Sequence, residues 1–99
     1  MATFSQDVRN LTALTCYDMD LILEQGIESA EDLAMFGEKD IDQLFQTSDL
    51  QTTPLMKQLK LKALAEWLRD RSYEGRGFPI HEATPSDINE KLLMDRARR

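Results

Sequence analysis

Residues 53–68 read TPLMKQLKLKALAEWL, and this stretch predicts the helix around which the protein folds. Thr53 before Pro54 is a strong helix start, because proline at the first helical position loses no hydrogen bond and has its backbone angle preset. At 100° per residue the following segment carries apolar side chains over most of its circumference. The helix is expected to continue to about Ser72 or Tyr73. A helix this apolar is the element against which the others should pack.

The two sides of this predicted helix differ in composition. Its broad apolar face contains Leu55, Met56, Leu59, Ala63 and Trp67, extended by Leu61, Leu64 and Leu68. Its narrow remaining arc contains Gln58, Lys62, Ala65 and Arg69. Only this arc is free of large apolar groups. We interpret Trp67, on the broad face, as a core residue and not as a platform for a ligand.

Short helices are expected before the long one. Thr15 and Asp18 have the spacing of a capping box, which predicts a helix over residues 16–25. Ser29 opens a brief second helix in the same manner, and the acidic segment 38–42 begins a third. These patterns predict an all-α fold of about four or five helices, with the short ones preceding the long one.

Residues 47–53, TSDLQTT, form a polar and turn-prone stretch before the long helix. We expect a loop with at most one helical turn, anchored by Leu50.

Gly26 is a natural stop for the helix over 16–25, because glycine tolerates the left-handed conformation that follows a helix.

The two ends of the chain carry weaker patterns. Ser5 can cap a segment containing Val8 and Leu11, so residues 1–14 are expected to form an N-terminal arm or a short helix. Residues 15–73 form the predicted domain. Two glycines and a proline make 74–84 a linker at which the compact part of the chain should end.

A last helix is predicted within residues 85–99. Thr84, Pro85 and Asp87 supply a cap, a first-position proline and an acid in the first turn. Ile88 and Leu92 give this helix only a thin apolar stripe, so we expect it to dock weakly or to fold against a partner.

Length and composition exclude several classes of protein. Ninety-nine residues suffice for one domain with a modest core. No run approaches the roughly 20 apolar residues of a membrane helix, and the N-terminus lacks the pattern of a signal peptide. We therefore expect an intracellular protein, cytoplasmic or nuclear, that does not bind membranes.

No set of residues predicts catalysis. Cys16 and His81 are the only thiol and the only imidazole, and a structural zinc site needs four such ligands. We expect His81 to be exposed in a loop, and no sequence feature pairs it with Cys16. The chain is predicted to be neither an enzyme nor a carrier of a metal or cofactor.

Charge is divided unevenly along the chain. Residues 1–50 hold eleven Asp and Glu against Arg9 and Lys39, a net charge of −9, whereas residues 51–99 hold ten Lys and Arg against seven acids, a net charge of +3. Such asymmetry favours contact with an oppositely charged surface, and a second copy of the chain carries one. The alternative is that both halves carry ordinary solvated helix faces.

The chain resembles the sterile alpha motif (SAM) domains over about residues 11–68. The matching segments are GIES at 26–29 with Asp32-Leu33 after it, EKDI at 38–41, and the long final helix that includes 57–68. Residues 47–53 stand where that family has a fourth short helix. The resemblance implies a protein-protein interaction role, as an adaptor or oligomerisation module.

Many SAM domains associate head to tail, and the resemblance implies which residues would take part. The acidic residues would be Glu31, Asp32, Glu38, Asp40, Asp42 and Asp49. The basic residues at the start of the long helix would be Lys57, Lys60 and Lys62. The partner would be another copy or a related helical domain, and a contact between unlike patches would build an open filament unless it closes into a ring.

Nucleic-acid binding is the alternative function. The cations available for phosphates are Lys57, Lys60, Lys62, Arg69, Arg71, Arg76, Arg96, Arg98 and Arg99. A sequence pI near 4.7 argues against this reading, because the acidic half would repel a polyanion.

Overall fold

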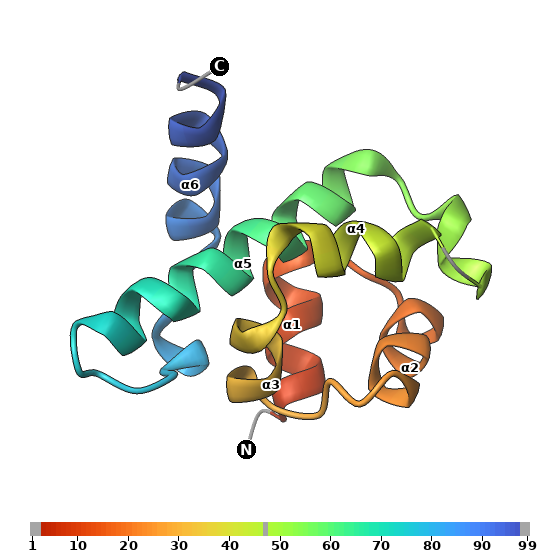
Figure 1. Ribbon diagram of the computed structural model, residues 1–99, viewed down its shortest axis with the longest axis horizontal. Coiled ribbons are helices and arrows are strands. Elements are labelled where there is room, and N and C mark those ends of the chain that lie inside the picture. The colour runs from red at the N-terminus through yellow and green to blue at the C-terminus, as the bar shows by residue number, and fades with distance from the viewer. Residues whose placement is uncertain (1–2, 47, 98–99) are drawn as a thin grey trace.

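The computed structural model describes residues 3–46 and 48–97, which form six α-helices, two 3₁₀ helices and no strand (Figure 1). The all-α prediction is confirmed. In chain order the elements are α1 (Phe4–Thr12), α2 (Cys16–Glu24), α3 (Ala30–Met35), α4 (Glu38–Gln46), η1 (Ser48–Thr52), α5 (Leu55–Tyr73), η2 (Ile80–Glu82) and α6 (Pro85–Ala97).

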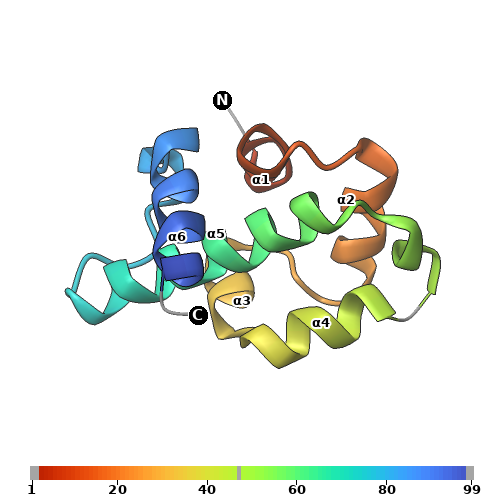
Figure 2. The same ribbon diagram turned by 90° about the horizontal axis from the view of Figure 1, so that it is seen from above.

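The long helix α5 is the centre of the fold, as its sequence predicts. It contacts α1, α3, α4 and α6. Seen from above, α5 runs through the middle of the molecule with α1 on one side and α3 and α4 on the other (Figure 2). Its residues Leu61, Leu64 and Leu68 are fully buried, and Trp67 is 6% exposed, so Trp67 is a core residue as predicted.

Local capping sets the starts of the short helices. Thr15 and Asp18 form the predicted capping box of α2, and the Ser29 hydroxyl accepts a hydrogen bond from the Asp32 N–H at the start of α3 (3.2 Å). Gly26 has φ +93° after α2, a conformation that glycine adopts without steric cost. These starts depend on residues within three positions of each other, which is why the sequence predicts them.

The cap of α1 differs from the prediction. The side chain of Thr3, not Ser5, accepts a hydrogen bond from the Gln6 N–H (3.1 Å). Val8 and Leu11 are buried residues of this helix, which contacts α2, α5 and α6. Residues 4–12 are therefore an integral helix of the bundle, because their apolar side chains complete the core.

The start of α5 also differs from the prediction. Pro54 is the N-cap residue, one position before the helix begins, and Thr53 gives no capping hydrogen bond. Thr53 is instead buried, because Leu50 beside it anchors η1 in the core. The predicted loop over 47–53 thus contains one turn of 3₁₀ helix, while residue 47 lies outside the described residues.

The two faces of α5 are not divided as the periodicity indicates. On the narrow arc that lacks large apolar groups, Ala65 is fully buried, and Arg69 donates hydrogen bonds to the carbonyls of Ala34 (3.2 Å) and Phe36 (2.7 Å) at the end of α3. On the broad apolar face, in contrast, Leu55 and Met56 are exposed. Contacts with neighbouring helices, and not the helical periodicity alone, thus decide which side chains of α5 are buried.

The glycines after Tyr73 predict that the compact part of the chain ends there, but it continues beyond them. Ile80 in η2 and Ile88 in α6 are buried in the same core as the earlier helices. Lys91 on α6 forms an ion pair with Asp70 on α5 and lies 3.9 Å from a carboxylate oxygen of Glu66. The predicted thin stripe is thus sufficient to dock α6, because its Ile88 is fully buried and the Lys91–Asp70 ion pair adds to the contact.

Candidate interaction surfaces

An acidic surface occupies the first turns of α3 and α4. It consists of Glu31, Asp32, Glu38 and Asp40, four of the predicted site residues. Two of them also stabilise the local backbone: the Asp32 carboxylate accepts a hydrogen bond from the Glu28 N–H, and the Asp40 carboxylate accepts one from the Gly37 N–H, both at 3.1 Å. Residues 15–46 carry nine acids and one lysine, and α5 adds the Arg69 guanidinium at the end of α3.

The two remaining predicted acidic residues, Asp42 and Asp49, are not part of this surface. Asp42 forms an ion pair with Lys62, which joins α4 to α5 within one molecule. These two residues were predicted to lie in opposite patches that meet between copies. The structure corrects this, because α4 and α5 pack together and bring the pair into contact. The side chain of Asp49 lies outside the described residues.

The predicted basic surface is reduced to Lys57 and Lys60, one turn apart at the start of α5. Both side chains are half-buried. Neither forms an ion pair with a described carboxylate. The acidic surface and this pair therefore remain as two separate sites of opposite charge.

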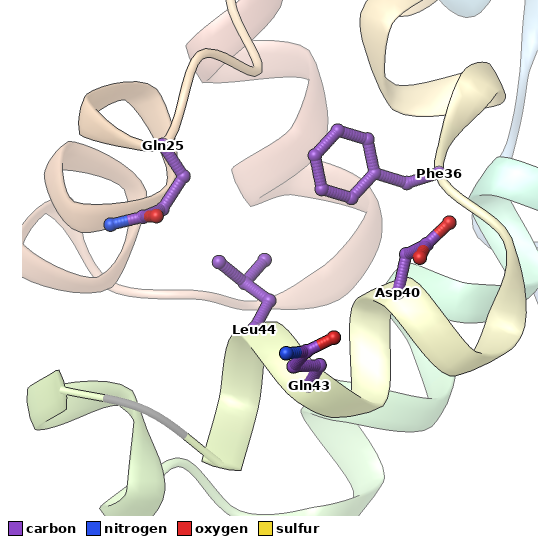
Figure 3. A pocket seen from close by; sticks show the side chains of 5 residues that line it. All are labelled: Gln25, Phe36, Asp40, Gln43 and Leu44. Carbon is purple, nitrogen blue, oxygen red and sulfur yellow. The ribbon is translucent and has the colours of Figure 1, made fainter.

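A hollow of about 340 Å³ adjoins the acidic surface (Figure 3). It lies between the C-terminal ends of α2 and α3 and the side of α4, and its walls are Gln25, Phe36, Asp40, Gln43 and Leu44. Phe36 and Leu44 point into the same space, and Asp40 lies at its edge. The hollow thus combines two apolar side chains, Phe36 and Leu44, with two amides and the Asp40 carboxylate.

Most of the other cations proposed to bind phosphate are engaged within the molecule. Arg69 binds the carbonyls at the end of α3. Arg71 pairs with Glu74 at 3.2 Å and lies 5.0 Å from the centroid of the Trp67 ring. Arg76 lies 3.9 Å from Glu74 and 3.7 Å from Glu82. These contacts leave few described cations for a polyanion, and the side chains of Arg96, Arg98 and Arg99 lie outside the described residues.

Sequence reasoning missed an apolar groove between α5 and α6. Met56, Leu59, Asn89, Leu92 and Leu93 enclose about 380 Å³. Leu55 and Leu93 are 67% and 68% exposed beside it. The sequence places Leu55 and Met56 on the apolar face of the helix, and only the structure shows that both stay exposed and that the first buried residue of α5 is Leu61.

The residues considered for chemistry lie apart from these surfaces. Cys16 and His81 are both exposed, on α2 and η2. Over residues 3–46 and 48–97, no three His, Cys, Asp or Glu side chains are grouped so that they could hold a metal ion. Within the same residues no helix has the length and apolarity to span a membrane.

Comparison with known proteins gives no relative from which a function can be transferred. No family model, curated protein or solved structure matches the chain. The resemblance to SAM domains stays a prediction.

Proposed function

We propose that this protein is a non-enzymatic protein-protein interaction module that associates head to tail through unlike surfaces. The acidic surface with its hollow forms one side of the contact. Lys57 and Lys60 of another copy, or of a related helical domain, form the other. The observation that carries the proposal is the hollow in which Phe36 and Leu44 lie together with the Asp40 carboxylate.

Such a hollow suits a lysine side chain. Lysine has an apolar stem that can be buried and an ammonium group that stays at a polar edge. Phe36 and Leu44 would cover the stem, and Asp40 would receive the ammonium group. The hydrogen bond from Gly37 uses one oxygen of that carboxylate, so acceptor capacity remains for a cation.

The position of the two surfaces determines the form of assembly. The acidic surface lies at the starts of α3 and α4, whereas the lysines follow η1, beyond the far end of α4. A contact between two different surfaces of one molecule is heterologous, and repetition of it yields an open chain or a ring. This architecture is also what the SAM-like resemblance implies.

Nucleic-acid binding has less support as an alternative. It requires several cations to meet phosphates at once, because affinity grows with each counterion released. Arg69, Arg71 and Arg76 have partners within the molecule, and Lys62 pairs with Asp42. We expect no salt-sensitive binding to either DNA or RNA.

The proposal predicts association that salt suppresses. In sedimentation velocity at about 50 mM salt, the protein should form larger species as its concentration rises, and about 0.5 M salt should weaken this by screening exposed charges. Lys57→Glu should weaken the low-salt association by about tenfold or more, because it places a negative charge opposite the acidic surface.

Two controls make this experiment specific. Lys39→Glu changes the net charge by the same amount but lies within the acidic segment, so association should persist or strengthen. A mixture of the Lys57→Glu and Glu31→Lys proteins should form dimers but no larger assemblies. The first protein keeps an intact acidic surface and the second keeps intact lysines, so each pair can make one contact. Undiminished association of Lys57→Glu at low salt would contradict the proposal.

A further inference from the structure

An exposed methionine accompanies each of the two charged surfaces. Met35 is 75% exposed on α3, and Met56 is 47% exposed at the start of α5. A single exposed apolar side chain is ordinary on a protein surface. Here, however, one stands beside the acidic residues of α3 and the other beside the lysines of α5, so the two methionines indicate what the contact contains besides charge.

The charges and the methionine have the same spacing on both helices. On α3 the positions i, i+1 and i+4 are Glu31, Asp32 and Met35. On α5 the positions i, i+1 and i+4 are Met56, Lys57 and Lys60. Residues four apart lie on the same side of a helix, one turn from each other. The methionine follows the acids on α3 but precedes the lysines on α5, so the order is reversed.

The reversed order fits two helices that pack antiparallel. When α3 of one copy lies antiparallel to α5 of the next, placing Met35 against Met56 brings Lys60 beside Glu31, because one turn separates the members of each pair. Neither Lys60 nor Glu31 forms an ion pair with a described side chain of its own molecule. The same alignment therefore matches apolar with apolar and cation with anion.

The hollow lies next to this alignment. Its wall includes Phe36, the residue after Met35, and Lys57 is the residue after Met56. A contact between the two methionines thus brings Lys57 within reach of the hollow and of the Asp40 carboxylate. The lysine site and the methionine contact are compatible parts of one interface.

The two methionines cannot meet within one molecule. The end of α3 is held at Arg69, whose guanidinium binds the Phe36 carbonyl at 2.7 Å. Met56 precedes Arg69 by thirteen residues on the same helix, a separation of about 20 Å along its axis. Figure 1 likewise shows α3 and the first turn of α5 in separate parts of the molecule. A contact between these faces therefore requires a second copy.

We propose that the head-to-tail contact has an apolar half, in which Met35 of one copy packs against Met56 of the next with α3 and α5 antiparallel. This inference rests on the proposed function and names the side chains that meet. Exposed ion pairs contribute little affinity, whereas burial of apolar area drives association. Methionine suits such a contact because its unbranched side chain adapts to the surface it meets.

A double-mutant cycle across a single contact tests the proposal. The Lys57→Glu protein presents an intact acidic surface and the Glu31→Lys protein presents intact lysines, so their mixture makes one contact per pair. Met35→Gln is added to the first protein and Met56→Gln to the second. Glutamine has nearly the length of methionine and no charge, so the charges of the contact stay the same.

Each glutamine should raise the dissociation constant about fivefold at low salt, measured by isothermal titration calorimetry. The two together should raise it by about five- to tenfold and not by the roughly 25-fold that independent sites give, because residues in contact are not additive. The salt dependence of binding should not change, since no charge is altered. Met35→Leu should bind almost as the methionine protein does, because it keeps an apolar side chain of similar volume.

Met94→Gln in the Glu31→Lys protein is the matched control. Met94 is 50% exposed on α6, close to the exposure of Met56, and lies outside the proposed contact. This variant should bind with unchanged affinity. Circular dichroism should show equal helicity for all variants, because each substitution is at an exposed position.

The inference and the proposed function fail separately. Unchanged affinity of either Met35→Gln or Met56→Gln, or a roughly 25-fold effect of the two together, would overturn the methionine contact and leave the head-to-tail contact standing. Absence of binding between the Lys57→Glu and Glu31→Lys proteins themselves would contradict the head-to-tail contact. It would overturn the inference as well and leave the two methionines to a different partner.

Discussion

Thr53 places a buried hydroxyl at the entrance to α5. Its Oγ1 has no hydrogen-bond partner among the described residues, and the helix begins at Leu55 without a side-chain cap. Burying a hydroxyl without a partner costs free energy, whereas an apolar group of the same shape does not incur that cost. Thr53 therefore contributes its methyl group to the core and not a cap to the helix.

Thr53→Val tests this assignment at the residue scale. Valine has the same branched shape without the hydroxyl, so we expect the free energy of unfolding to stay unchanged or to rise by up to about 1 kcal/mol. Urea denaturation followed by circular dichroism measures the change. A helix cap would give the opposite result, a loss of about 1 kcal/mol, so the sign distinguishes the two roles.

At the scale of elements, Arg69 joins the middle of the long helix to the end of α3. Its guanidinium donates to two carbonyls near the C-terminus of α3, at 3.2 and 2.7 Å. A helix ends with carbonyls that lack partners within the helix and carries partial negative charge there, so a cation is favourable. Ala65, one turn earlier on α5, is fully buried.

Arg69→Met should therefore destabilise the fold by about 2 kcal/mol, because methionine retains apolar bulk but leaves both carbonyls unsatisfied. For a domain of this size the melting temperature should fall by roughly 10 °C. Arg76→Met is the matched control, since Arg76 forms only exposed pairs, which contribute little. An equal effect of the two substitutions would exclude a specific role for Arg69.

At the scale of the whole molecule, α6 shares the core of the earlier helices. Ile88 is buried with residues from α1 to α5, and Lys91 pairs with Asp70. A segment held in this way should unfold together with the rest, since small domains usually unfold in one cooperative step. The structure thus favours a single cooperative unit over a domain with a loosely attached helix.

Ile88→Ala tests this cooperativity. Loss of a fully buried isoleucine should cost about 2 to 5 kcal/mol of global stability. Fluorescence of Trp67, the only tryptophan, and circular dichroism at 222 nm should give coincident unfolding curves in both proteins. A separate early transition in the circular dichroism signal, without a change in Trp67 fluorescence, would show that α6 unfolds independently.

The sequence by itself determined the helices. Capping boxes, glycine stops and helical periodicity predicted α2, α3, α4 and most of α5 and α6, because each signal acts between residues within one turn of each other. The central place of α5 followed from its unusually wide apolar face. The charge asymmetry of the chain likewise followed from the positions of the charged residues in the sequence.

Only the tertiary structure decided which side of each helix meets another. Asp42 and Lys62 are twenty residues apart and form a pair that removes them from the predicted patches, and Leu55 remains exposed although it lies on the predicted core face. Spacing along one helix fixes the direction of a side chain but not which element lies opposite it. The hollow beside Asp40 and the groove beside Leu93 exist only because separate helices come together, so no local pattern could reveal them.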